Sequence, residues 1–236
     1  VAALNTLNGK TTVDINHSFS SITGEYTNVN TLFVNKADFN PDLGTLPITL
    51  TDTGSINAAD LNQMNDATSG LVTATNATTI TGSASQLDTL LAAEGDTGNK
   101  INLDTDYNIT INSGTATISQ INNYAAATSG IITATLVNMT LADSAAITET
   151  GNAYTITLTD SAITSDTDVA ALNTLNGKTT VDINHSISSI TGEYTNVNTL
   201  FVNKADFNPD LGTLPITLAA NVTVSELITI NNHTSG

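Results

Sequence analysis

The chain of 236 residues carries a formal net charge of −17, because 22 acidic residues stand against only five basic residues, all of them lysine. It therefore lacks the clustered cations that phosphate contacts need, which excludes nucleic acid as a partner. No apolar run approaches the roughly 18 residues of a membrane span, so we expect no membrane insertion.

The rest of the composition is that of a repeat protein. Charged residues make up 11% and aromatic residues 4%, while threonine occurs 44 times and asparagine 29 times. Hydrophobic residues still reach 39%, so there is a core to bury. The absence of cysteine favours a bacterial surface protein or a cytosolic one over a disulfide-bonded domain. Because the chain starts at Val1 and ends in mid-pattern, we expect a fragment of a longer array.

Predicted strands and helices alternate along the chain. Residues 2–9 read as a short helix ending in Asn-Gly, and residues 48–51 alternate apolar residues with threonine, as a strand with one buried face does. Residues 155–159 repeat that strand pattern. We expect parallel rather than hairpin pairing of these strands, because hairpin turn signals are scarce.

Three later helices are marked by a capping box, in which a hydroxyl and a side chain three residues on bond each other's backbone N–H. After the first box, Leu87, Leu90 and Leu91 lie on one predicted helix face, and Gly95 suits the residue after the helix. The three boxes are Ser83 with Gln86, Thr117 with Gln120, and Thr223 with Glu226.

Internal repetition defines the architecture. Residues 1–50 recur at 169–218 with one change, Phe19 to Ile187. Fainter copies share an apolar anchor residue, and the anchors lie 57, 60, 51 and 55 residues apart. These anchors are Leu4, Leu61, Ile121, Leu172 and Leu227. The predicted repeat units are approximately 1–56, 57–116, 117–163, 164–222 and a partial 223–236.

Each repeat unit divides into halves, as residues 48–70 and 71–95 show: an alternating strand run, a capping residue, then a leucine-bearing helix run. Such a half is too short to fold alone and buries its apolar face by stacking on its neighbours. The sequence therefore predicts one elongated α/β solenoid over 1–236, with parallel strands on one side, short helices on the other and about eight to nine coils.

The strings LNQMNDATSGLVTATNATTITGSASQLDTLLAAEG (61–95) and AALNTLNGKTT (2–12) resemble repeats of giant cell-surface proteins, related to motility and adhesion, of marine cyanobacteria and related bacteria. The resemblance covers essentially the whole chain, and the TSG-x-(V/I)-T-A-T phrase is its most specific part. It implies an extracellular or cell-surface location and a long repetitive molecule, and it supplies no catalytic residues.

Calcium is the candidate metal ion. Asp, Asn and Asp at every second position offer oxygen atoms to a hard cation, as an EF-hand loop does. The alternative is an Asx-rich turn, because the glycine comes one residue late and Thr49 stands where an EF-hand has glutamate. The candidate ligands are Asp38, Asn40 and Asp42, their duplicates Asp206, Asn208 and Asp210, and Asp104, Asp106 and Asn108.

Catalysis is not expected, and neither is a small-molecule substrate. The chain has no arginine, tryptophan or cysteine, and none of its histidines, His17, His185 and His233, stands in a catalytic or metal-ligand pattern. Paired threonines such as Thr73 with Thr75 suggest binding of ice or a regular polymer, against the simpler interpretation as exposed strand residues. The other pairs are Thr133 with Thr135 and Thr155 with Thr157.

Two functions follow from these features. The first is a structural segment of a bacterial extracellular surface protein, self-associating end to end or side by side into a rod, filament, sheath or surface layer. The second is a spacer or stalk of a large adhesin, with calcium as a candidate stabiliser. Polymerisation of the isolated segment distinguishes the first from the second.

Overall fold

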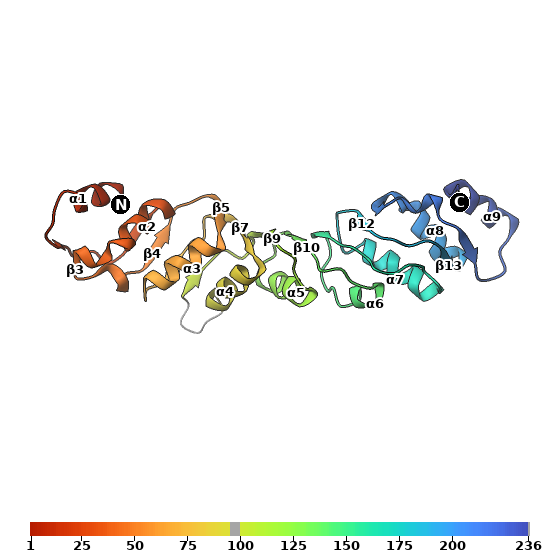
Figure 1. Cartoon of the computed structure of the whole chain (residues 1–236), viewed down its shortest axis with the longest axis horizontal. Helices are drawn as coiled ribbons and strands as arrows, with labels where there is room; N and C mark the ends of the chain where they lie inside the picture. The colour runs from red at the N-terminus through yellow and green to blue at the C-terminus, as the bar shows by residue number, and fades with distance from the viewer. Residues whose placement is uncertain (95–99, 236) are drawn as a thin grey trace. The chain divides into compact units, whose positions relative to one another are not determined.

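The computed structural model (Figure 1) describes residues 1–94 and 100–235. They belong to two compact units, one of Val1–Gly114 with Tyr124–Gly130 and one of Thr115–Asn123 with Ile131–Gly236. Short strands and helices alternate in both, and strands pair in parallel, so the chain has an α/β fold with parallel sheets. The predicted helix-ending residue Gly95 lies outside the described residues.

In the first compact unit, pairs of short strands precede a helix, and we call this arrangement a β-β-α segment. The sequence predicts one strand per helix, but the chain bends within the predicted strand run; Gly54, at φ +88°, begins the second strand of one such pair. The first segment consists of β4 (Ile48–Leu50), β5 (Gly54–Asn57) and α3 (Ala58–Ala67), and the second of β6 (Val72–Thr73), β7 (Ala77–Ser83) and α4 (Ala84–Glu94). The third consists of β8 (Ile101–Asn102), β9 (Asn108–Ser113) and α5 (Ile118–Ala127), and the first turns of α5 belong to the other compact unit. Before them come α1 (Ala2–Asn8), β1 (Ile15–Asn16), β2 (Ile22–Gly24), α2 (Tyr26–Val34), β3 (Phe39–Asn40) and the 3₁₀ turns Lys36–Asp38 and Leu43–Thr45.

The strands of successive segments lie side by side in register. In the sheet β2-β4-β6-β8, Ile22 pairs with Ile48, Ile48 with Val72 and Val72 with Ile101, so partners lie 26, 24 and 29 residues apart. In the neighbouring sheet β7 lies between β5 and β9. One segment therefore adds one strand to each sheet, at the spacing that the half-repeat predicts.

The core lies between the strands and the helices. Ile48 and Leu50 are each 1% exposed, while the alternating threonines face outward, as the strand pattern predicts. Leu87 and Leu90 of α4 are fully buried and Leu91 is half-buried. Each such fully buried side chain contributes about 1.5–3 kcal/mol of hydrophobic stabilisation.

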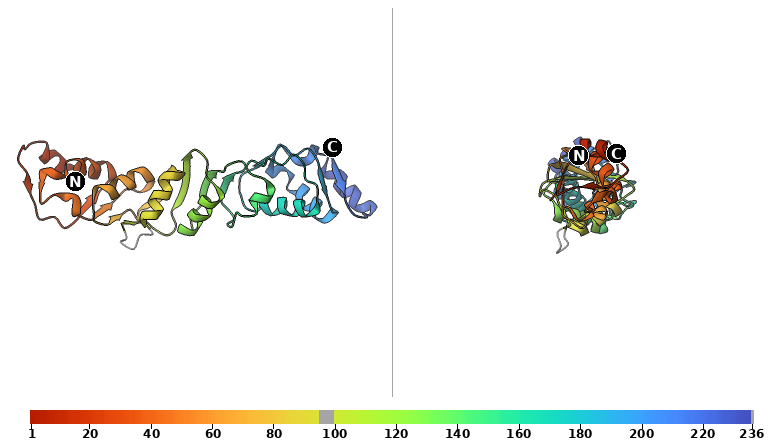
Figure 2. Two further views of the ribbon diagram at one scale, coloured as in Figure 1. Left: turned by 60° about the horizontal axis from the view of Figure 1, so that its bottom comes forward. Right: turned by 90° about the vertical axis from the view of Figure 1, so that its left-hand side faces the viewer.

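The second compact unit repeats this organisation, and Figure 2 shows its helices and strands from two further directions. β13 pairs with β15 on one side, and Ile190 of β13 bridges to Ile163 on the other, so this ladder also continues from segment to segment. The elements are β10 (Ile132–Thr135), α6 (Leu141–Ser144), β11 (Ala153–Thr155), α7 (Asp166–Asn176), β12 (Ile183–Asn184), β13 (Ile190–Gly192), α8 (Tyr194–Val202), β14 (Phe207–Asn208), β15 (Ile216–Leu218), α9 (Val224–His233) and the 3₁₀ turns Lys204–Asp206 and Leu211–Thr213.

All three predicted capping boxes are confirmed. In the last of them, the Glu226 backbone N–H donates to Thr223 Oγ1 at 3.3 Å, and the Thr223 N–H donates to Glu226 Oε2 at 2.7 Å. The same reciprocal pair joins Ser83 with Gln86 and Thr117 with Gln120. The local sequence therefore fixes where these helices begin.

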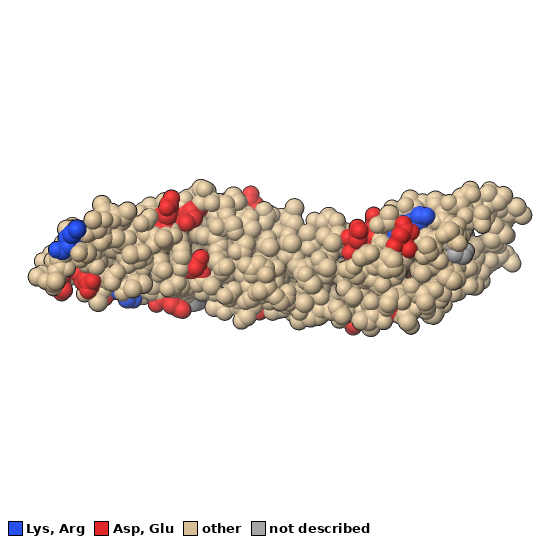
Figure 3. Space-filling model, turned by 45° about the horizontal axis from the view of Figure 1, so that its top comes forward, with Lys and Arg blue, Asp and Glu red and all other residues tan. Residues whose placement is uncertain are grey.

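The surface is acidic but sparsely charged. On the face drawn in Figure 3, most of the surface carries neither sign and acidic side chains predominate over lysines. Within residues 1–94 and 100–235, no helix is long and apolar enough to cross a bilayer.

Candidate assembly interface

The duplicated 50 residues provide an internal comparison of one sequence in two surroundings. We call residues 1–50 the first copy and residues 169–218 the second copy. Helix α1 of the first copy has no buried residue, whereas the same sequence in α7 buries Leu172 and Leu175. Leu7 is 50% exposed and its counterpart Leu175 is 2% exposed. Since the sequence is the same, the difference comes from the preceding segment that covers the second copy.

The covering segment can be named. Leu141 and Ser144 of α6 share a groove with Ala171 and Leu175 of α7, and strands beneath the helices join through Ile163 and Ile190. In the first copy the corresponding apolar surface is uncovered in the described chain. We call this surface, formed by Val1, Leu4, Leu7, Ile15 and Phe19, the N-terminal face.

At the C-terminal side of the two copies the difference in burial is reversed: the strand of the first copy is covered and that of the second copy is not. Ile48 and Leu50 are each 1% exposed and β6 pairs with β4, whereas the duplicates Ile216 and Leu218, without a strand in that place among the described residues, are only half-buried. Strand β15 pairs only with β13 among the described residues. Among the described residues, the second copy has no following segment whose strand pairs with β15.

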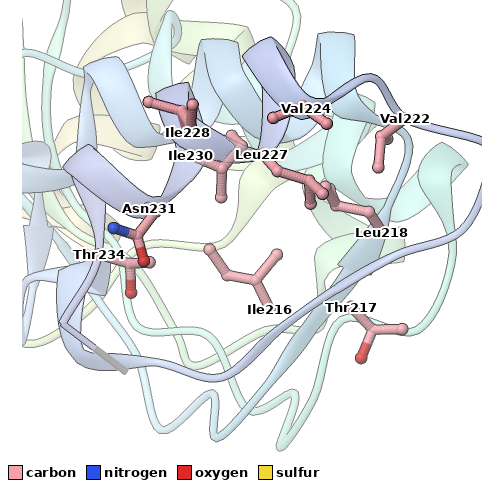
Figure 4. Close-up of a pocket in the computed structure, with 10 residues that line it drawn as sticks. All are labelled: Ile216, Thr217, Leu218, Val222, Val224, Leu227, Ile228, Ile230, Asn231 and Thr234. Carbon is pink, nitrogen blue, oxygen red and sulfur yellow. The ribbon is translucent and has the colours of Figure 1, made fainter.

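Half-buried and exposed apolar residues surround a groove of about 700 Å³ at this end (Figure 4). Leu227 and Ile228 of α9 are 48% and 56% exposed, whereas Leu61, the equivalent anchor in α3, is fully buried against the following segment. We call Ile216, Leu218, Leu227 and Ile228 the C-terminal face. The side chains that line this groove are apolar except for Thr217, Asn231 and Thr234.

An asparagine that follows the anchor residue joins its helix to the backbone of the next segment, at a helical residue in three cases and at Ala146, just after α6, in the fourth. Asn62 Nδ2, next to Leu61, donates to the Gln86 carbonyl of α4 at 2.9 Å, and the identical contact recurs after three other anchors. These are Asn5 to Asn28, Asn122 to Ala146 and Asn173 to Asn196, at 2.8 to 3.0 Å. After the fifth anchor, Leu227, the position holds Ile228 instead.

The Thr-Ser-Gly phrase holds each segment to the backbone of the one before it. Thr128 Oγ1 donates to the Tyr107 carbonyl at 2.6 Å and accepts from Gly130 N at 3.0 Å. A side chain on Gly130 would collide with the Tyr107 backbone, so glycine is required by this close approach. Thr68 makes the equivalent pair of bonds with Leu46 and Gly70.

In the sequence the anchor residues mark the repeat and the TSG phrase carries the resemblance, but neither pattern predicts the contacts that these residues make between segments. The recurrence of asparagine directly after four of the five anchors was the signal that pointed to them. Its partner carbonyls belong to the backbone of another segment, so only the fold identifies them.

The first group of calcium candidates is divided among separate partners. Asn8 Nδ2 donates to Asp38 Oδ2 at 3.0 Å, Asn40 Nδ2 donates to Asn16 at 3.0 Å, and Asp42 Oδ1 accepts from Gly44 N at 2.6 Å as the cap of a 3₁₀ turn. The duplicates Asp206, Asn208 and Asp210 make the same three contacts with Asn176, Asn184 and Gly212.

In the third group, Asp104 Oδ1 accepts from Thr105 N at 2.8 Å, Asp106 follows in the same loop, and Asn108 begins β9. No group of three or more His, Asp or Glu side chains in the described part of the chain is arranged to hold a metal ion. Calcium binding stays a prediction, which melting of the chain with and without a chelator tests.

His17 and His185 lie beside the strand ladders, as the predicted threonine pairs do, whereas His233 ends helix α9. His185 is 8% exposed; its Nδ1 accepts from Ile187 N at 3.1 Å and its Nε2 lies 2.7 Å from the Pro209 carbonyl oxygen. Burial lowers the pKa of His185. Thr135 lies opposite Thr155 in the β10–β11 pair, while Thr133 lies opposite Ala153.

Comparison with protein-family models, with curated proteins and with solved structures finds no match to this chain.

Proposed function

We propose that this chain is a structural repeat segment of a bacterial extracellular surface protein, whose β-β-α segments stack as the coils of an α/β solenoid and whose ends associate into a filament, sheath or surface layer. The burial of Leu175 supports it most directly: this leucine is 2% exposed because the preceding segment of the same chain covers it. Stacking is thus the interaction that these residues serve.

The chemistry of the chain agrees with a structural role. Two side-chain contacts recur at equivalent places in the repeat: an asparagine amide and a threonine hydroxyl each donate to a backbone carbonyl of another segment. These side chains therefore bind the protein's own backbone rather than a ligand. The acidic, cysteine-free composition and the resemblance of the repeats to those of giant bacterial surface proteins support the location. On this proposal the chain is not an enzyme.

Electron microscopy of the purified chain tests the proposal. A structural segment forms regular fibres or sheets at raised protein concentration. A stalk of an adhesin, the alternative, stays a single elongated particle under the same conditions. A compact particle, with a radius of gyration near the roughly 17–18 Å expected for a globular chain of this length, would rule out both.

A further inference from the structure

We propose that the chain opens locally at residues 136–163, which we call the α6 segment, and that the side chains of Asn122 and Lys178 form a latch that holds this segment closed. The α6 segment lies within the second compact unit and contains helix α6 and strand β11. Helix α5 precedes it and α7 follows it along the chain, so its contacts on both sides are made within the chain.

Helix α6 is the shortest α-helix in the described part of the chain, and Figure 1 shows it as a single turn. It has four residues, whereas α5 has 10 and α7 has 11. Ser144 N donates to the Thr140 carbonyl at 3.2 Å, and the N–H groups of Ala146 and Ile147 then donate only three residues back. A single turn gains little from helix propagation, so its stability depends on the groups that pack and bond against it.

The packing beside α6 is incomplete. A groove of about 280 Å³ lies between α6 and α7; Leu141 and Ser144 line it from α6, and Leu175 lines it from α7. All three side chains are buried, so the segment is folded at rest. Atoms that face such a gap have fewer contacts than atoms in a filled core, which lowers the cost of separating the two helices.

The loop after α6 is held by two side chains from the neighbouring segments. Asn122 Nδ2, in α5, donates to the Ala146 carbonyl at 2.8 Å, and Asn122 Oδ1 accepts from the N–H and the hydroxyl of Thr148, each at 3.2 Å. Lys178 Nζ, just after α7, donates to the Thr148 carbonyl at 3.0 Å. Thr148 is therefore bonded to the segments on both sides of its own.

The asparagine between two full-length helices makes fewer bonds. Asn62 Nδ2 donates to the Gln86 carbonyl, but Asn62 Oδ1 is buried without a hydrogen-bond partner among the described residues. There α3 and α4, of 10 and 11 residues, pack against each other. In the α6 segment the additional bonds of Asn122 and the bond of Lys178 take the place of that helix packing.

These bonds are accessible to water. Thr148 is exposed, and Asn122 and Lys178 are only half-buried, so water replaces the lost partners when the loop separates. A segment held by a few accessible hydrogen bonds opens at a lower free energy than one held by buried helix faces. On the proposed function, such a segment lets a long structural chain yield at one place and reclose while α7 and α8 stay folded.

Two variants each remove one side of the latch. Lys178→Met removes the ammonium group and keeps most of the apolar stem; Lys10→Met is its matched control, because Lys10 is the duplicate of Lys178 and is exposed. Asn122→Ala removes the amide group. Its matched control is Asn123→Ala, because Asn123 is the next residue of α5, is exposed, and gains the same helix propensity on substitution.

Hydrogen exchange of the backbone amides measures local opening. In the unmodified chain we expect the amides of Ser144 and Ile147 to be at least about tenfold less protected than those of Leu172 and Leu175 in α7. Each latch variant should speed exchange in the α6 segment by about fivefold and leave α7 unchanged, because it removes bonds that only the closed segment makes. The two control variants should change neither rate.

Equal protection of the α6 segment and of α7 in the unmodified chain would overturn the local opening. Exchange that stays at the unmodified rate in both latch variants, or that rises equally in α7, would overturn the latch. Neither result bears on fibre formation, which electron microscopy tests separately, so the local opening and the structural function fail independently of each other.

Discussion

Single hydroxyl groups connect the segments of this protein. Thr179 Oγ1 donates to the Tyr154 carbonyl at 2.7 Å and accepts from Tyr154 N and Val181 N. The hydroxyl of its duplicate Thr11 instead bonds the backbone of Val13, two residues away, because the described chain places no segment before it. Both positions hold threonine, and the contribution of each to stability depends on whether another segment lies beside it.

We therefore expect Thr179→Val to lower the free energy of unfolding by about 1–3 kcal/mol, since backbone groups at a buried position lose their partner. Thr11→Val, the matched control, should cost under about 0.5 kcal/mol. Urea unfolding of both variants measures the difference, and equal losses would contradict the role of the threonine in joining segments.

His185 makes stability depend on pH. Burial lowers its pKa below the ordinary 6.5, so the unfolded state binds more protons than the folded state as the pH falls below about 6.5. Protonation of Nδ1 also removes the acceptor for Ile187 N. The stabilisation is therefore complete above pH 6.5 and declines as the pH falls toward the folded-state pKa.

Denaturant midpoints at pH 7.5 and 5.5 should show this loss, and His185→Gln should reduce it. An NMR titration in which the His185 ring protonates above pH 6.5 in the folded chain would contradict the argument.

At the scale of the element, α1 and α7 share the sequence from Ala2 to Asn8 and differ in what lies over them. The leucines of α7 are fully buried, whereas Leu4 of α1 is half-buried and Leu7 is exposed, so those of α1 contribute less to the core. Over the shared residues the helix propensity is the same, but α7 begins three residues earlier and is capped by Ser165, so capping and tertiary packing decide how firmly each helix is held.

Leu175→Ala should therefore lower the free energy of unfolding by about 2–5 kcal/mol, the usual range for a buried leucine. Leu7→Ala, at the same position of α1, should cost less than about 1.5 kcal/mol because half of the side chain is already in water. Chemical denaturation at low protein concentration, where chains do not associate, makes this comparison; a larger cost for Leu7→Ala would contradict it.

At the scale of the whole molecule, the net charge of −17 opposes close association of its parts and of its copies. Raising sodium chloride from about 10 to 150 mM shortens the Debye length from about 30 to 8 Å and weakens that repulsion. We expect the melting temperature and the extent of assembly to rise together over this range.

Calcium chloride at equal ionic strength is the matched control for screening. The same rise with both salts indicates screening alone, whereas a further rise with calcium, reversed by a chelator, indicates calcium binding at one or more of the three predicted loops. A melting temperature that falls with sodium chloride would contradict the repulsion argument.

The sequence by itself determined the local features: the three capping boxes, the alternation of Ile48 and Leu50 with threonines, the parallel pairing and the spacing of segments. These follow from short-range hydrogen bonding and from the periodicity of apolar residues, which a sequence displays directly. Only the tertiary structure decided which apolar residues are covered. Leu7 and Leu175 have identical sequence neighbours on both sides, and their burial differs because it depends on the segment stacked against them, which local sequence does not encode.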